Sequence, residues 1–195
     1  MYALKNIGGV CLRKFIKLIS ENISTVNQYT KDQEEQVEYA LRVFIFETLK
    51  IIGSIIIFSL IGYPIQAIVA IITMCAIKPY IGGYHEDTQL KCFIATLIII
   101  AIITYLSLFI NLNFMSKVIL SIVVFFAIWH QAPIINPAMP LTRKDLINRN
   151  RILGLSIATI FILIALIFSG YIVVSNTILW TLIISTLLMF NKRSR

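Results

Sequence analysis

Six long apolar runs decide what this chain can fold into. They span residues 41–62, 64–77, 90–110, 114–131, 152–170 and 172–190. A helix needs roughly 20 apolar residues to cross the hydrocarbon core of a membrane. Only 13% of the residues are charged, about half the share found in soluble domains. The sequence therefore predicts an all-α integral membrane protein, a bundle of about six transmembrane helices.

The second run, residues 64–77, is shorter than the others. At this length a re-entrant or tilted segment competes with a full crossing of the membrane, and both alternatives stay open. Along the chain we expect three regions: an amphipathic amino-terminal region over residues 1–40, a transmembrane domain over 41–191, and a basic tail over 192–195.

Lysine and arginine side chains gather on alternate connections between the runs. They occupy the stretch before the first run, the connections after the second and fourth runs, and the carboxy-terminal tail, whereas the other connections carry none. By the positive-inside rule, both termini are predicted to be cytoplasmic. The three cysteines, Cys11, Cys75 and Cys92, lie on or near that reducing side, so no structural disulfide is expected.

Residues 1–20 have the pattern of an amphipathic helix. One face collects the apolar residues Leu4, Cys11, Phe15, Leu18 and Ile19, and another collects Arg13, Lys14, Lys17 and Ser20. Such a helix is expected to lie in the membrane interface and to contact lipid. A docking surface for an acidic or amphipathic partner is the alternative.

Glu47 and Lys50 lie inside the first run, three residues apart. Ionisable residues within a membrane span often mark a functional site, such as the coupling site of a transporter. A helical pair of opposite charge at this spacing can also neutralise itself. The sequence favours the structural role.

The polar stretch KPYIGGYHEDTQLKCF, residues 78–93, separates the second and third runs and contains His85 and Cys92. On one unbroken helix these two residues would lie about 10.5 Å apart along the axis, whereas a base must come within roughly 3 Å of its nucleophile. A break in the chain is therefore required for the two to react. Pro79 is expected to end the preceding helix, Gly82 and Gly83 to form the turn, and Asp87 or Thr88 to cap the next helix.

These residues could form a catalytic site. A thiol in the first turn of a helix meets the positive end of the helix dipole, which favours the thiolate. Glu86 or Asp87 could orient the imidazole, and the amides of Gly82 and Gly83 could bind an oxyanion. Taken alone, one histidine and one cysteine at a membrane boundary are more often packing residues. No metal site or cofactor is predicted, because no ligand spacing is recognisable.

The connection over residues 131–151 contains three of the five prolines, so its first half is expected to be extended. Thr142 and Asp145 have the spacing of a capping box, which predicts a short basic helix after Pro140. The positive charge of this connection either sets the topology or receives an acidic segment of a substrate.

The motif GGYH followed by CF, with His85 and Cys92 seven residues apart, is similar to that of the AgrB family, the membrane peptidases of Gram-positive quorum sensing. The likeness covers nearly the whole chain. It includes the six-span size, the basic amphipathic amino terminus and the stretch AP..N..MPL over residues 132–141. The resemblance implies a multi-pass protein of the bacterial cell membrane, with His85 as general base and Cys92 as nucleophile.

The resemblance also implies a substrate, an AgrD-like propeptide with an amphipathic start, a central signal sequence and an acidic tail. Cys92 would release the tail and hold the remainder as a thioester, which an internal cysteine or serine of the propeptide would close into a thiolactone or lactone. The residues implied in holding the tail are Arg143, Lys144, Arg149 and Arg151. A peptide transporter without covalent chemistry and a membrane scaffold remain as alternatives. No nucleic acid is expected as a partner, and a homodimer stays open.

Overall fold

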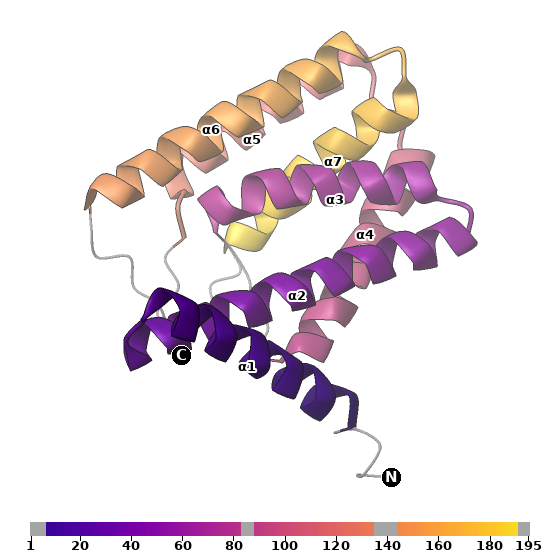
Figure 1. Cartoon of the computed structure of the whole chain (residues 1–195). Helices are drawn as coiled ribbons and strands as arrows, with labels where there is room; N and C mark the ends of the chain where they lie inside the picture. Colours follow the sequence, from indigo (N-terminus) through magenta and orange to yellow (C-terminus); the bar gives the residue numbers. More distant parts are fainter. Residues whose placement is uncertain (1–6, 83–87, 135–143, 191–195) are drawn as a thin grey trace. The chain divides into compact units, whose positions relative to one another are not determined.

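The computed structural model describes residues 7–82, 88–134 and 144–190, with residues 7–14 described by their backbone only. All regular secondary structure in these residues is helical (Figure 1). The helices are α1 (Ile7–Asn27), α2 (Lys31–Leu60), α3 (Pro64–Ile81), α4 (Gln89–Phe109), α5 (Phe114–Gln131), α6 (Lys144–Ile167) and α7 (Ile172–Phe190).

The helices α2 to α7 are each long and apolar enough to cross a membrane. The predicted all-α membrane fold with six candidate spans is confirmed. The limits of α5 and α7 agree with the predicted runs, whereas α3 continues four residues beyond its predicted end, to Ile81. At 1.5 Å per residue, α3 is about 27 Å long, which is close to the thickness of a bilayer's hydrocarbon core.

The chain divides into two compact units, Met1–Gly53 and Ser54–Arg195, and each is described by itself. In the first unit, Phe15 and Leu18 of α1 are exposed, whereas Ile16 and Ser20 are fully buried. An exposed apolar strip is what an interfacial helix needs on the side that faces lipid. The placement of α1 in a membrane interface stays a prediction.

α2 begins well before the first apolar run, at Lys31. Thr30 caps it: its hydroxyl accepts a hydrogen bond from the Gln33 amide at 3.4 Å, and its own amide donates to Gln33 Oε1 at 2.9 Å. This reciprocal arrangement is a capping box. The polar segment before the first run is therefore the start of the same helix.

In the second unit, α7 packs against α3, α4, α5 and α6 and is its central helix (Figure 1). Its buried face is rich in small polar residues: Ser175, Asn176, Thr177, Thr181, Ser185 and Thr186. The hydroxyls of Thr177, Thr181 and Thr186 donate to carbonyls four residues earlier in α7. Such bonds satisfy a hydroxyl inside its own helix, so these side chains can be buried without partners on other helices.

A buried lysine links three helices of this unit. Lys117 of α5 is 2% exposed, and its Nζ donates to Ser175 Oγ of α7 at 2.7 Å. Ser175 in turn donates to the carbonyl oxygen of Ala165 in α6 at 2.6 Å. From Thr88 to Arg195 the sequence contains one carboxylate side chain, Asp145 at the start of α6. The Lys117 amine is therefore bonded to a hydroxyl, that of Ser175, and this hydroxyl is oriented by the Ala165 carbonyl.

Replacing Ser175 with alanine should lower the free energy of unfolding by about 2 kcal/mol, because a buried amine loses its acceptor. In a Lys117→Met background the same change should cost only about 1 kcal/mol, the value of the remaining bond to Ala165. Unfolding titrations in detergent, followed by tryptophan fluorescence, would measure both values. If Ser175→Ala lowers the free energy of unfolding equally with lysine and with methionine at position 117, the hydrogen bond between Lys117 and Ser175 does not contribute to stability.

Candidate functional site

The chain breaks between α3 and α4, in the stretch that contains His85. α3 ends at Ile81, and Gly82 follows with φ +73° and ψ −157°. Thr88, with φ −122° and ψ 145°, precedes the first residue of α4. Neither residue has helical dihedral angles, so no single helix runs from α3 into α4. The predicted break is present.

Pro79 does not end α3, and this part of the prediction is wrong. It lies inside the helix, which continues through Tyr80 to Ile81. A proline in a helix removes one hydrogen bond to the carbonyl four residues earlier. The loss falls on the turn before the proline, so the residues after it, Tyr80 and Ile81, can stay helical. Gly82, with its positive φ, is the residue at which α3 stops.

Thr88, one of the two residues predicted as a cap, caps α4. Its side chain accepts a hydrogen bond from the Lys91 amide at 3.4 Å, and its carbonyl accepts one from the Cys92 amide at 2.9 Å. Cys92 is therefore the fourth residue of the helix, at the end of its first turn. The positive end of the helix dipole falls within this turn.

Cys92 is a reduced thiol on a half-buried residue. Its carbonyl accepts a hydrogen bond from Thr96 Oγ1 at 2.9 Å, so its backbone is held at both ends by α4. Because Cys92 lies on a regular helix, its backbone has a well-defined position. The partial burial of the residue limits access to its sulfur. Cys75 is also reduced, but it lies within α3 and is exposed.

Several predicted site residues lie outside the described part of the chain: Gly83, His85, Glu86, Asp87 and Arg143. The pairing of His85 with Cys92 and a role of either acid as its orienting group therefore stay predictions. The amide of Gly82 donates to the Lys78 carbonyl at 3.0 Å, so this amide serves the end of α3. Gly82 fits the predicted turn, and its N–H is directed into the helix.

The end of α3 meets the end of α5, a contact that the sequence did not predict. The Ile134 amide donates to the Ile81 carbonyl at 2.9 Å. A Cβ atom at Gly82 would come well within 3.0 Å of the Ile134 carbonyl oxygen. The residues are far apart in the sequence, and the positive φ of Gly82 has no sequence signal beyond the pair of glycines.

The start of α6 joins the same place. Arg151 Nε donates to the carbonyl oxygen of Ala132 at 2.9 Å, and Ala132 itself is 1% exposed. A Cβ atom at Gly154 would lie 3.0 Å from Ile81 Cγ2. We call this set of residues, Ile81, Gly82, Ala132, Ile134, Arg151 and Gly154, the three-helix junction. Arg151 therefore has a structural partner, which its sequence position among basic residues did not indicate.

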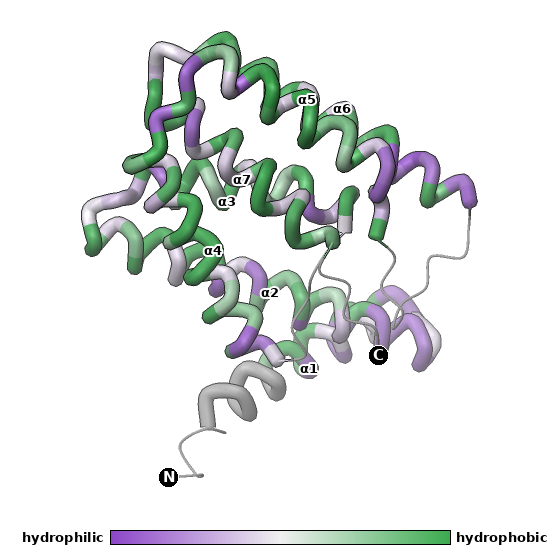
Figure 2. The backbone as a smooth tube through the Cα atoms, turned by 180° about the vertical axis from the view of Figure 1, so that it is seen from behind, coloured by the Kyte–Doolittle hydropathy of each residue, from purple (hydrophilic) through white to green (hydrophobic). Residues whose placement is uncertain are grey.

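The basic segment after Pro140 is not a separate short helix. From Lys144 onward it forms the first turns of α6, which continues into the apolar span (Figure 2). Lys144 and Arg149 are exposed there. An uninterrupted helix is favoured because no glycine or proline stands between Lys144 and Gly154.

Glu47 and Lys50 form the ion pair that their spacing allows. Lys50 Nζ lies 2.5 Å from Glu47 Oε2 on α2. A charged pair in contact on one helix is a self-contained way to place two ionisable groups in an apolar segment. This geometry fits the structural role predicted from the sequence.

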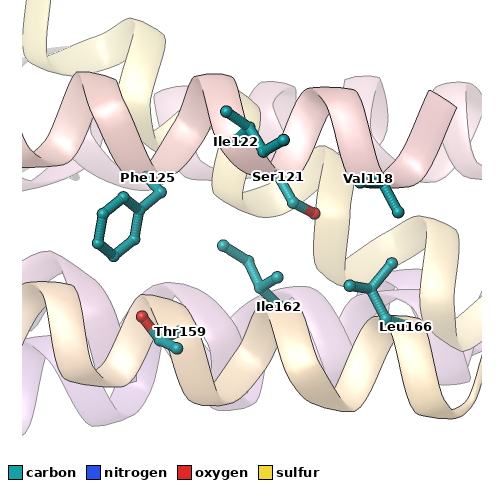
Figure 3. Close-up of a pocket in the computed structure, with 7 residues that line it drawn as sticks. All are labelled: Val118, Ser121, Ile122, Phe125, Thr159, Ile162 and Leu166. Atoms are coloured by element: carbon teal, nitrogen blue, oxygen red, sulfur yellow. The ribbon is translucent and has the colours of Figure 1, made fainter. Parts of the chain in front are cut away.

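An apolar groove of about 250 Å³ lies between α5 and α6 (Figure 3). Its two hydroxyl groups are already bonded within their own helices, Ser121 to the Lys117 carbonyl and Thr159 to the Leu155 carbonyl. None of the predicted catalytic residues lines it. The groove thus offers an apolar surface and no group suited to act on a peptide bond.

Comparison with known proteins agrees with these features along nearly the whole chain. The family described as accessory gene regulator B (AgrB) matches residues 12–190. An AgrB-like protein 1 from Clostridium perfringens (strain 13 / Type A) is 46% identical over 184 residues, which cover 94% of this chain and 98% of that protein.

A second AgrB-like protein, from C. perfringens (strain SM101 / Type A), is 27% identical over 179 residues, 88% of this chain and 82% of that protein. No solved structure matches the chain. The family links the chain to quorum-sensing peptide processing in the accessory gene regulator system. With its six apolar spans and a family match over residues 12–190, the chain belongs to the AgrB family.

Proposed function

We propose that this protein is a cysteine endopeptidase of the bacterial cell membrane that removes the acidic tail from an AgrD-like propeptide and cyclises the remainder. The observation that carries the proposal is the position of Cys92 at the end of the first turn of α4, after a break that separates it from α3. The family membership supports the same function. Both termini would lie in the cytoplasm, where the propeptide is made.

The proposed reaction has two steps. His85 takes the proton of the Cys92 thiol, and the sulfur attacks the carbonyl carbon at the junction before the tail. The carbon–nitrogen bond breaks, the tail amine receives the proton from His85, and the signal sequence stays on Cys92 as a thioester. A cysteine or serine within the propeptide then attacks that thioester, forms the ring and returns the thiol of Cys92.

The energy of the two steps differs. Transfer of an acyl group from one thiol to another costs little, whereas forming a thioester from a peptide bond is uphill. Removal of the tail or of the cyclic product must therefore drive the reaction. Arg143, Lys144 and Arg149 are proposed to hold the acidic tail, since positive side chains beside an acidic segment favour its binding.

The thioester can be trapped with a propeptide whose ring-forming cysteine or serine is replaced with alanine. Because the second step is then blocked, the protein should gain the mass of the propeptide without its tail, less one water molecule. Hydroxylamine should remove this adduct, and the Cys92→Ala variant should not form it. Intact-protein mass spectrometry gives the measurement.

The two histidines of the chain provide a matched comparison in the same assay. His85→Ala should slow formation of the adduct by about 10²- to 10⁴-fold, the usual contribution of a general base. His130 is exposed at the end of α5, and His130→Ala should leave the rate close to that of the wild type. An adduct that forms equally fast in both variants would rule out His85 as the base.

A further inference from the structure

The three-helix junction contains Gly82, the residue that precedes residues 83–87 in the sequence. We call residues 83–87, which include the proposed base His85, the catalytic segment. Ile81 and Gly82 are bound to Ile134 through the Ile134 amide and the close approach of the Gly82 backbone to the Ile134 carbonyl. Residues 83–87, including His85, follow directly after Gly82 in the sequence. The position of the α3 end therefore sets where that segment begins.

The end of α5 is held in turn by α6. Arg151 donates through Nε to the carbonyl of Ala132, two residues before Ile134. The ends of α3 and α5 and the start of α6 lie on one side of the second unit (Figure 1). Two hydrogen bonds, joined by the backbone between Ala132 and Ile134, thus connect Arg151 to Ile81.

We propose that Arg151 is a positioning residue for the peptidase reaction, which acts through this chain of contacts and does not hold the acidic tail. The inference rests on the proposed function. It concerns the Nε–H group of Arg151 and not its charge. Displacing a reacting group by about 1 Å can cost about 10²-fold in rate, so a change at this distant side chain should reduce kcat.

Glutamine and lysine separate the two roles at position 151. The Nε2 atom of glutamine is at the same distance along the side chain as the Nε atom of arginine, so Arg151→Gln keeps the donor and loses the charge. Arg151→Lys keeps the charge but places a methylene group where Nε was. The pair therefore distinguishes a hydrogen bond to Ala132 from a charge that attracts the tail.

We expect Arg151→Gln to keep kcat for tail release within about 3-fold of wild type, and Arg151→Lys to lower kcat about 10-fold, with KM little changed in both. The same substitutions at Arg149 form the matched comparison. At position 149 lysine should be the better tolerated replacement. Arg149→Gln should raise KM for a propeptide with an acidic tail, and Arg149→Lys should keep KM close to that of the wild type. The assay uses purified full-length protein in lipid vesicles and a synthetic propeptide.

The inference is overturned if lysine preserves activity at position 151 and glutamine does not, or if both variants behave alike. A second measurement uses a propeptide whose tail carboxylates are replaced with amides. Arg151→Lys should lower kcat by the same factor on both propeptides. If Arg151 contacted the acidic tail, the effect of the substitution would disappear on the propeptide with amides. Arg151→Ala with Ile134→Pro, which removes the Ile134 N–H, should lose no more than the worse single variant.

Failure of this inference is distinguishable from failure of the proposed function. If Cys92→Ala still releases the tail, the peptidase mechanism is wrong regardless of the order at position 151. If Cys92→Ala is inactive and the order at position 151 is that of a charge, only the role assigned to Arg151 is wrong. Thermal unfolding of each variant in the same vesicles shows whether a loss of rate comes from loss of the folded protein.

Discussion

Replacing Cys92 with serine is expected to lower the rate of tail release by about 10³-fold or more, because the proposed covalent route then depends on a poor nucleophile. The side chains are nearly equal in size, and a serine hydroxyl is a much weaker nucleophile than a thiol. Since Cys92 is half-buried near the start of α4, the fold should tolerate the change. Mass spectrometry of the released tail, after co-expression with a propeptide, measures the effect.

Cys75 is the control for this experiment. It is also a reduced cysteine, but it lies exposed within α3, and Cys75→Ser should release the tail at the wild-type rate. Comparable cleavage by the Cys92 and Cys75 variants would end the case for Cys92 as nucleophile. Loss of processing in Glu47→Ala, with Cys92→Ser active, would instead favour a transporter.

Gly82→Ala is the substitution with the second largest expected effect. The residue has φ +73°, and an added Cβ would collide with the backbone oxygen of Ile134. The backbone angles of Gly82, φ +73° and ψ −157°, cost a non-glycine residue about 1–3 kcal/mol, and overpacking adds about 1–3 kcal/mol. The sum should lower the free energy of unfolding by about 3 kcal/mol and displace the start of the catalytic segment, so tail release should also fall.

Gly62 is the control for a positive φ without a close contact. It has φ +92°, and a Cβ there would meet nothing within 4 Å, so Gly62→Ala should cost only about 1–2 kcal/mol. Unfolding titrations in detergent compare the two variants. If they are equally stable, the contact between Gly82 and Ile134 is not a tight one.

Most of the membrane fold could be predicted because apolar runs of this length cross a bilayer as α-helices, in which the backbone hydrogen bonds are satisfied within the segment. The limits of α5 and α7 follow from residues that are visible locally: Asn113 accepts a hydrogen bond from the Ser116 amide at the start of α5, and the short connection at Gly170 precedes α7. The cap at Thr88 was predictable for the same reason. These signals lie within a few residues of the feature that they produce.

The parts that could not be predicted depend on contacts between distant segments. A lone lysine near the end of a span could be a topological signal, and only packing shows that Lys117 is buried against Ser175. Arg151 similarly resembled its basic neighbours until its bond to Ala132 was seen. Pro79 misled because a proline disturbs the turn that precedes it, and the helix can continue past it to Ile81. The pairing of His85 with Cys92 still rests on the sequence motif, because residues 83–87 lie outside the described part of the chain.

The central position of α7 has a consequence for synthesis. This helix leaves the ribosome after α3, α4, α5 and α6, the four helices against which it packs. Helices that enter a bilayer first and associate afterwards must wait for their common partner. The second unit can therefore complete its packing only when α7 has been made, and until then the faces of α3, α4, α5 and α6 that contact α7 lack that partner.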